Sequence, residues 1–332
     1  MSIIRQDLST KDWTIFALER AKRPKDFKQK KRRKSSIRHS ANCPFCKGNE
    51  DKTPGELFRI SNGGSWLVRV VPNKYPALSS REELNYSVSR HIDGPYLNME
   101  GIGSHEVIIE SPRHNDSIAF MEKEHLEKVL VAYKQRYVEL SKNENYQLII
   151  IFRNHGVRAG TSLEHSHSQL VATPFVPAYV RNKLYESQRY FDDFGNCVYC
   201  DMIKNEIQSE KRMVYENDKF ISFCPYASVV PYHTLILPKK HQSCFAEIGD
   251  SSLEDLADIL KKILMGMDKL LGDPDYNYVI DSAPPDKSGA KHYHWHLEIL
   301  PRLTTRAGFE IGSGMYINTI LPEDCAYSLR KS

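Results

Sequence analysis

Residues 105–114 read HEVIIESPRH, and residues 233–241 read HTLILPKKH. Each segment is a short apolar run of strand-forming residues that begins and ends with a histidine. A helical pattern follows each segment, with apolar residues three and four positions apart over residues 119–143 and 253–272. Each helical pattern leads into another apolar strand, at 146–152 and 276–280. The chain therefore contains the same succession of strand, helix and strand twice.

The ends of the two repeats also agree, because each finishes with alternating histidines and a proline. These segments are HSHSQLVATP at 165–174 and HYHWHLEILP at 292–301, and corresponding positions lie 127 or 128 residues apart. The pattern predicts an α+β fold of two fused halves, each a mostly antiparallel sheet with one long helix. We expect an N-terminal half over 1–177 and a C-terminal half over 178–332, with the polar stretch 178–196 as the link.

Composition narrows the class of protein. The chain has 332 residues, of which 40% are hydrophobic and 27% are charged, and its net charge is +4. No apolar run approaches the ~18 residues of a membrane span, and the N-terminus lacks a secretion-signal pattern. We therefore expect a soluble cytoplasmic protein. The basic run from Lys22 to Lys34 is interpreted as a solvated loop.

Two C-x-x-C pairs, CPFC at 43–46 and CVYC at 197–200, join the repeat. Such a pair brings two thiolates to one tetrahedral zinc ion, which needs two further ligands. The repeat indicates these two ligands in each half: the histidine after the first strand and the first histidine of the alternating set. We expect two Zn²⁺ sites, formed by Cys43, Cys46, His114 and His165, and by Cys197, Cys200, His241 and His292.

The second site has an open question. His294 and His296 alternate with His292, and all three would share one face of a strand. The repeat register selects His292 among them. A redox-active cysteine pair is the alternative to zinc at either C-x-x-C motif.

The segment FRNHGVRAGTSLEHSHSQ at 152–169 predicts the chemistry. Its glycines let the backbone approach a phosphate closely, and a nucleophilic histidine follows them. We predict that His167 attacks an α-phosphorus and forms a covalent nucleotidyl-histidine. The Gln169 amide would stabilise charge in the transition state, while His165 would bind metal and fix the strand. A metal-binding role alone for both histidines is the alternative.

The motif N-x-G-x-x-A-G-x-S-x-x-H-x-H-x-Q resembles the active site of the histidine-triad superfamily, in the galactose-1-phosphate uridylyltransferase branch. The resemblance also includes ERAKRP (19–24), VVPNKYPA (70–77) and ESPRH (110–114), so that it covers nearly the whole chain. It implies two fused triad-like halves, a homodimer, bound zinc and ping-pong nucleotidyl transfer in carbohydrate and galactose metabolism.

The resemblance also assigns residue roles by position. His167 matches the nucleophile and Gln169 the phosphate-stabilising glutamine. The substrate contacts that it implies, with nucleotide, base, ribose or phosphate, are Arg20, Arg23, Asn73, Lys74, Tyr75, Asn154, Gly160 and Ser162.

Two departures from the sugar-transferring enzymes concern the acceptor. Their strand reads H-P-H-G-Q, whereas this strand reads HSHSQ, and their hexose-binding Lys, Tyr and Glu correspond here to Gly308, Ser313 and Gly314. Recognition of a hexose needs several directed hydrogen bonds, which this segment does not offer. The motifs are more similar to the ADP-glucose phosphorylase-like branch. The expected donor is a UDP-hexose or ADP-glucose, and the acceptor is a hexose 1-phosphate or inorganic phosphate.

Other functions stay open. A dinucleoside polyphosphate phosphorylase would use the same nucleophile, and a hydrolase would use water as the acceptor. A zinc-dependent nucleic-acid-binding module is the alternative from another class, although its basic residues would be confined to one stretch.

Overall fold

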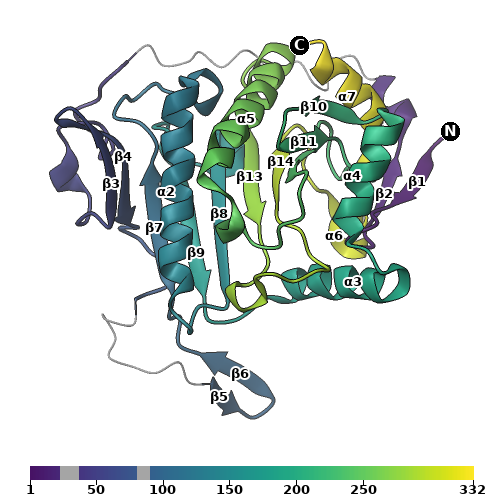
Figure 1. Cartoon of the computed structure of the whole chain (residues 1–332), viewed down its shortest axis with the longest axis horizontal. Coiled ribbons are helices and arrows are strands. Elements are labelled where there is room, and N and C mark those ends of the chain that lie inside the picture. The colour runs from purple at the N-terminus through teal and green to yellow at the C-terminus, as the bar shows by residue number, and fades with distance from the viewer. Residues whose placement is uncertain (23–36, 81–89) are drawn as a thin grey trace.

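The computed structural model describes residues 1–22, 37–80 and 90–332. Ten antiparallel strands form one continuous sheet in the order β10-β11-β12-β14-β13-β8-β9-β7-β4-β3 (Figure 1). Their bounds are Phe58–Asn62 (β3), Ser65–Pro72 (β4), Ser104–Ile109 (β7), Leu148–His155 (β8), His167–Thr173 (β9), Met213–Glu216 (β10), Phe220–Phe223 (β11), Thr234–Pro238 (β12), Tyr276–Asp281 (β13) and His296–Pro301 (β14).

The strand order shows the predicted duplication directly. Each half contributes five strands, and the two sets meet where β8 pairs antiparallel with β13, with Tyr278 opposite Arg153. The order from this seam outward is β8-β9-β7-β4-β3 on one side and β13-β14-β12-β11-β10 on the other. The two predicted halves therefore share a single sheet, and the exact division at residue 177 stays a prediction.

Both long helices lie side by side on one face of this sheet (Figure 1). They are α2 (Lys123–Ser141) and α5 (Asp250–Leu271), as the apolar spacing predicts. Leu126 and Leu130 of α2 and Leu256 and Leu260 of α5 are buried in the core between helices and sheet. Burial of each such leucine contributes about 1.5–3 kcal/mol to the free energy of folding.

The remaining elements lie around this core. The other helices are α3 (Ala178–Phe194), α4 (Val198–Ser209), α6 (Gly308–Ser313) and α7 (Pro322–Arg330), with short 3-10 turns at Leu18–Lys22 (η1), Glu50–Lys52 (η2), Ile118–Phe120 (η3), Val157–Ala159 (η4), Phe245–Glu247 (η5) and Pro285–Lys287 (η6). Two smaller sheets are formed by β1 (Ile3–Gln6), β2 (Trp13–Phe16) and β15 (Tyr316–Asn318), and by β5 (Arg90–Asp93) and β6 (Tyr96–Met99). Within the described ranges, no helix has the length and apolarity that a membrane span requires.

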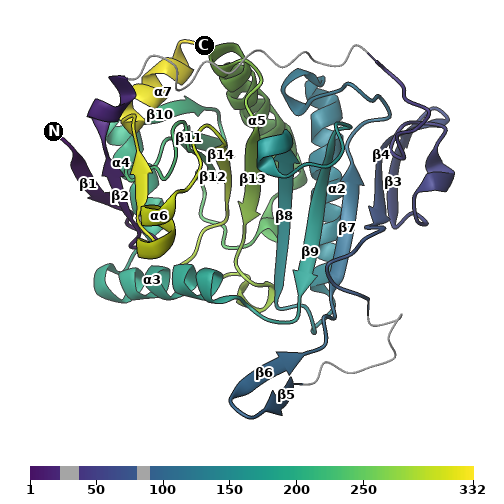
Figure 2. The same cartoon turned by 180° about the vertical axis from the view of Figure 1, so that it is seen from behind.

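The polar stretch that is expected to link the halves is the helix α3 over most of its length. Its buried residues, Val180, Lys183 and Ser187, lie three and four positions apart and share one face of α3. Seen from behind, β7, β8 and β9 have no α-helix in front of them, whereas α3 and α6 lie beside the strands of the C-terminal half (Figure 2). Within residues 1–22, 37–80 and 90–332, the two halves therefore differ in how the second face of the sheet is covered.

Candidate functional site

The predicted catalytic strand, β9, lies between β7 and β8 in the N-terminal half. Successive side chains of a strand point to opposite faces. Ser168 and Leu170 are buried on the side of α2, so His167 and Gln169 face the other side. This places the predicted nucleophile on the face that no α-helix covers among the described residues of the N-terminal half (Figure 2).

His167 is held in one orientation by the backbone carbonyl group of His165. Its Nδ1 lies 2.8 Å from the carbonyl oxygen of His165, and because a carbonyl only accepts, Nδ1 carries the hydrogen. The Nε2 atom of the neutral ring then carries a lone pair. His167 is 8% exposed, and Phe45 packs against its ring at 5.3 Å between centroids. Burial lowers the pKa of His167, as does the charge of Arg153.

Gln169 is oriented by His105. The backbone N–H of Ala77 donates to His105 Nδ1 at 3.0 Å, so the hydrogen of the neutral ring lies on Nε2. That nitrogen lies 2.8 Å from Gln169 Oε1, and the Asn73 amide lies 3.4 Å from the same oxygen. The carbonyl side of the Gln169 amide is thereby occupied, which leaves its NH₂ group as the donor for a substrate oxygen.

Beneath the strand lies a buried ion pair between Glu110 and Arg153. Arg153 Nη1 donates to the carbonyl oxygen of His167 at 3.1 Å, and Ser166 Oγ donates to Glu110 Oε2 at 2.6 Å. Ser168 also donates to Glu110, and Tyr133 donates to Glu110 Oε1 at 2.9 Å. Burial raises the pKa of Glu110, but Arg153 and these hydroxyls outweigh it, so that the pKa is lowered overall. The two serines of HSHSQ are therefore partners of this carboxylate.

The small-residue loop before the strand requires glycine at one position in particular. Gly156 has φ +88°, and a Cβ atom there would lie 1.9 Å from Asp275 Oδ1. The other carboxylate oxygen of Asp275 accepts the backbone N–H of Arg158 at 2.7 Å. Gly156, Asn154 and His167 border a small cavity of about 70 Å³. Asn154 Oδ1 accepts a hydrogen bond from Asn277 at 2.7 Å, so this loop is fixed to β13.

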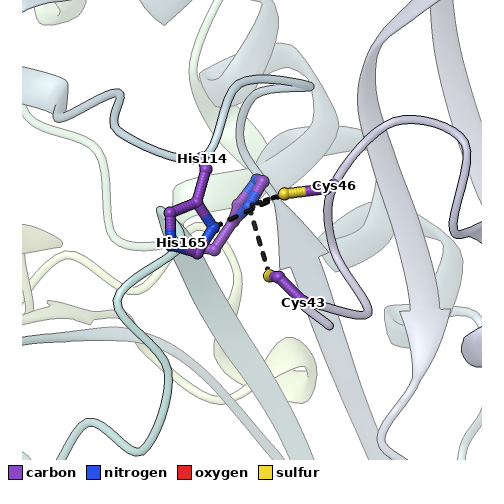
Figure 3. Close-up of side chains that lie close together, drawn as sticks. All are labelled: Cys43, Cys46, His114 and His165. Atoms are coloured by element: carbon purple, nitrogen blue, oxygen red, sulfur yellow. Dashed lines mark hydrogen bonds between the residues drawn. The ribbon is translucent and has the colours of Figure 1, made fainter. Parts of the chain in front are cut away.

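Cys43, Cys46, His114 and His165 come together beside the catalytic strand (Figure 3). Their ligand atoms all lie within 4.8 Å of one another. The cysteine turn approaches the two histidines from the opposite side (Figure 3). His165 Nε2 donates to the carbonyl oxygen of Ser111 at 2.7 Å, which directs Nδ1 toward the thiols and is the usual support for a metal-binding histidine.

The spacing of these atoms fits a tetrahedral metal ion. Three of the S···N distances in the cluster are 3.4, 3.6 and 3.6 Å. Tetrahedral zinc with Zn–S of ~2.3 Å and Zn–N of ~2.0 Å requires S···N distances of about 3.5 Å. Four protein ligands would fill the coordination sphere, so the cluster can hold the strand but cannot also activate a water molecule.

The C-terminal half has a matching cluster of Cys197, Cys200, His241 and His294. Cys200 Sγ lies 3.4 Å from His241 Nδ1 and 3.6 Å from His294 Nδ1. The prediction of His292 is therefore wrong, because His294 takes that place in the cluster.

The reason is visible in the strand register. Val107 pairs with Gln169 in the first half, and Leu235 pairs with Glu298 in the second. Val107 and Leu235 are each two residues after the first histidine of the repeat. Gln169 thus corresponds to Glu298, and His165 to His294. The segment before β14 contains two additional residues, which the 127-residue register does not include.

Within one chain, some of the predicted substrate-binding residues lie near His167 and Gln169, and others lie elsewhere. Asn73 reaches Gln169, while Lys74 and Tyr75 lie exposed on the same loop. Gly160 and Ser162 are exposed, with Gly160 at φ +87°. Arg20 borders a different cavity of about 660 Å³, together with Thr304, Thr305 and Phe309. Arg23 lies outside the described residues.

Sequence reasoning missed the residues that position the catalytic pair. These are Phe45, His105, Glu110, Arg153, Ser166 and Ser168. His105 marks the start of a repeat in the sequence, and Glu110 precedes the SPRH motif, but neither pattern indicates a partner. Glu110 and Arg153 are 43 positions apart in the sequence, and they come together because the strands of the sheet pair.

Comparison with known proteins gives a consistent result over the full length. Residues 2–177 match the galactose-1-phosphate uridyl transferase N-terminal domain, and residues 183–330 match its C-terminal domain. ADP-glucose phosphorylase from Arabidopsis thaliana is 38% identical over 331 residues, which are 99% of this chain and 92% of the plant protein. Galactose-1-phosphate uridylyltransferase from Thermotoga maritima is 27% identical, over 100% and 99% of the two chains.

A solved structure agrees with these relatives. The crystal structure of an ADP-glucose phosphorylase from Arabidopsis thaliana with bound ADP-glucose superposes with a TM-score of 0.85 at 35% identity. The match covers 100% of this chain and 99% of that chain.

Proposed function

The chain belongs to the galactose-1-phosphate uridylyltransferase family of nucleotidyltransferases, and we propose that it transfers an adenylyl group from ADP-glucose to inorganic phosphate. The observation that carries this proposal is the geometry of His167, whose Nδ1–H is held by the His165 carbonyl and whose Nε2 carries the free lone pair. The similarity to ADP-glucose phosphorylase supports adenylyl as the transferred group.

The first half-reaction forms a bond between His167 Nε2 and the α-phosphorus of ADP-glucose. The bond from that phosphorus to the bridging oxygen breaks, and glucose 1-phosphate leaves with the electron pair. The imidazole gains positive charge as it bonds to phosphorus, and the His165 carbonyl oxygen at Nδ1 stabilises that charge. The NH₂ group of Gln169 donates to an oxygen of the phosphoryl group and supplies no proton to the nucleophile.

The second half-reaction is the same displacement in reverse. An oxygen of inorganic phosphate attacks the α-phosphorus, the P–N bond breaks, and ADP leaves with His167 restored. Inorganic phosphate as acceptor agrees with the segment Gly308–Gly314, since it needs no set of hydroxyl-binding side chains. Uridylyl transfer between UDP-glucose and a hexose 1-phosphate is the second candidate, which the T. maritima relative favours.

A substrate matrix tests the proposal. Purified protein is incubated with ADP-glucose or UDP-glucose, each with phosphate, glucose 1-phosphate or galactose 1-phosphate. We expect phosphate-dependent formation of ADP and glucose 1-phosphate from ADP-glucose. Turnover only with UDP-glucose and galactose 1-phosphate would support the second candidate. Nucleotide release at the same rate without any acceptor would indicate hydrolysis.

We propose zinc for both Cys/His clusters, because two thiolates with two imidazoles in tetrahedral spacing suit Zn²⁺. In the first cluster, Cys43 and Cys46 would tie their turn to His165, and Phe45 between them packs on His167. The ion would therefore support the strand that aims the nucleophile. Elemental analysis of protein purified without added metal is expected to give two zinc ions per chain.

We also propose a homodimer in which each site takes residues from both chains. Arg20 and the segment that includes Phe309 border one cavity, and His167 borders another. Mixing the inactive variants Arg20→Ala and His167→Gly is expected to restore part of the activity, because mixed dimers contain one intact site. Absence of recovery in a mixture shown to exchange subunits would contradict a shared site.

A further inference from the structure

A cavity of about 400 Å³ lies beside β14 of the C-terminal half, the strand that corresponds to the catalytic strand of the N-terminal half, and residues of both halves border it. His296 and Glu298 of β14 border it, and they correspond by strand register to His167 and Gln169. His296 Nδ1 lies 3.1 Å from the His294 carbonyl oxygen, as His167 Nδ1 lies 2.8 Å from that of His165. The second half therefore retains the framework of the active site.

The pair behind the strand is retained as well. His233 Nε2 lies 2.8 Å from Glu298 Oε1, and His105 Nε2 lies 2.8 Å from Gln169 Oε1. His233 and His105 begin the two repeats. The duplicated parts thus agree in four positions. The corresponding pairs are His165 and His294, His167 and His296, Gln169 and Glu298, and His105 and His233.

The chemistry of this second site has nevertheless changed. A carboxylate, Glu298, stands where the catalytic half has a neutral amide, and it would repel a phosphoryl group placed over the strand. His296 Nε2 faces Asp281 Oδ2 at 3.4 Å, so the counterpart of the nucleophilic nitrogen is already engaged. The site is therefore unsuited to a second nucleotidyl transfer.

Lys183 of α3 enters the floor of the cavity from the helix that covers this half. Its Nζ lies 2.9 Å from Asp281 and 3.9 Å from Glu298, and its side chain is 5% exposed. The two carboxylates are thereby partly neutralised from within the chain, which removes the need for a bound cation. The histidine nitrogens on this floor are engaged within the protein, whereas the carboxylate oxygens keep further lone pairs that can accept from the hydroxyl groups of a polyol.

The mouth of the cavity has the opposite character. Arg158, Arg302 and Arg306 border it, and in the part of the chain that the structure describes none of the three forms a salt bridge with a carboxylate. The guanidinium of Arg306 lies 4.7 Å from the centre of the Tyr316 ring. Guanidinium groups that are not held in a salt bridge favour an anion such as a phosphate.

Two other acidic side chains on the wall are already occupied by hydrogen-bond donors. Asp7 Oδ1 accepts from the backbone N–H and the hydroxyl of Ser9, at 2.8 and 2.7 Å. Glu310 accepts from the backbone N–H groups of Ala307 and Ile317. The third, Asp12, has a pKa raised by burial, and Arg306 and Lys183 oppose this shift. The carboxylates of the wall are thus held by donors of the protein itself, and the charges of Arg306 and Lys183 partly offset that of Asp12.

We propose that this cavity binds a phosphorylated monosaccharide, with the sugar hydroxyls on Glu298 and the phosphate at Arg158 and Arg306. Tyr179, Tyr199 and Tyr316 supply aromatic surface along the wall for the sugar ring. The volume of about 400 Å³ lies within the range of small-molecule sites, roughly 300–1,000 Å³. The site is separate from His167 and goes beyond the proposed reaction.

Isothermal titration calorimetry with glucose 6-phosphate tests this site. The variants are Glu298→Gln, which installs the residue type of the catalytic half, and Arg306→Gln at the mouth. Arg189→Gln on α3 is the matched control, because Arg189 is an exposed arginine that does not border the cavity. Loss of one charge-assisted hydrogen bond is expected to weaken binding about tenfold or more in each cavity variant, with Arg189→Gln unchanged. Circular dichroism verifies that the variants are folded.

His167→Gly serves to separate this site from the catalytic one. We expect it to bind glucose 6-phosphate as tightly as the wild type, and glucose or inorganic phosphate alone to bind more weakly than the joined molecule. The proposal is overturned if the wild type shows no binding at millimolar concentrations. It is also overturned if His167→Gly abolishes binding while Glu298→Gln and Arg306→Gln retain it, because the heat would then arise at the catalytic site.

Discussion

Replacing Glu110 by glutamine tests how the catalytic strand is held. The side chain of Glu110 is fully buried and that of Arg153 is 3% exposed, and the two form an ion pair. Glutamine keeps the shape and one acceptor oxygen, and the hydroxyls of Ser166 and Ser168 can rotate to accept from its NH₂ group. The Arg153 guanidinium cannot adapt in this way, so it is left as a buried charge without a counterion.

The structure sets the expected size of this effect. Breaking a buried ion pair by removing one partner costs about 3–5 kcal/mol. That is a large part of the ~5–15 kcal/mol by which a typical protein is stable. Because Arg153 Nη1 also holds the His167 carbonyl oxygen, we expect turnover at permissive temperature to fall as well. The double variant Glu110→Gln/Arg153→Met removes both charges and is expected to recover part of the lost stability.

The pH dependence of the free energy of unfolding tests the role of Glu110 independently. The pKa of Glu110 in the folded protein is below its ordinary value, which is about 4.3 in an unfolded chain. The ionised carboxylate therefore stabilises the fold above pH ~4.3, and this contribution is lost as the pH falls through the lower, folded pKa. The difference in stability between wild type and Glu110→Gln is expected to be full near pH 7 and to shrink in that acidic range.

Urea unfolding followed by circular dichroism measures both effects. Glu139→Gln is the control, since Glu139 is an exposed residue of α2 that pairs with Lys142 at the surface. Its loss is expected to leave the urea midpoint almost unchanged, because solvent screens such a surface pair. If Glu110→Gln unfolded at the same urea concentration as Glu139→Gln at pH 7, the structural role assigned to the buried pair would be refuted.

Three further changes have clear expected outcomes. Cys43→Ser should lower the metal content of purified protein by one ion per chain and lower its melting temperature, because a metal site contributes folding energy; unchanged metal content would contradict the first cluster. His294→Ala should remove one metal ion by elemental analysis whereas His292→Ala should not, and the reverse result would restore the repeat register at that position. His105→Ala should lower kcat about tenfold with little change in KM, because Gln169 loses the group that orients its amide; an unchanged kcat would show that Gln169 needs no such support.

The sequence predicted those parts of the fold that local patterns specify. Apolar spacing located α2 and α5. The paired histidines located β7 and β12, and the alternating histidines located β9 in the first half and β14 in the second. The arrangement of the halves as one continuous sheet was not predicted, because the pairing of β8 with β13 joins residues about 125 positions apart. No local signal reports such a contact.

The site was predicted where a motif names a residue and missed where a residue acts through the fold. The first metal cluster follows from the C-x-x-C spacing and the repeat, whereas the second was displaced from His294 to His292 by two additional residues before β14. Lys183 was assigned to a polar link, but helical periodicity turns it toward the interior. Its burial beside Asp281 and Glu298 becomes visible only once α3 is packed against the sheet.

The most direct test of the account is to find where the nucleotide is attached during turnover. The protein is mixed with ADP-glucose labelled at the α-phosphorus, without phosphate, quenched in alkali and digested for peptide mapping. We predict label on the peptide that contains His167, its release as ADP on addition of inorganic phosphate, and its absence from His167→Gly. Label on another residue, or full turnover by His167→Gly, would contradict the central role of this imidazole.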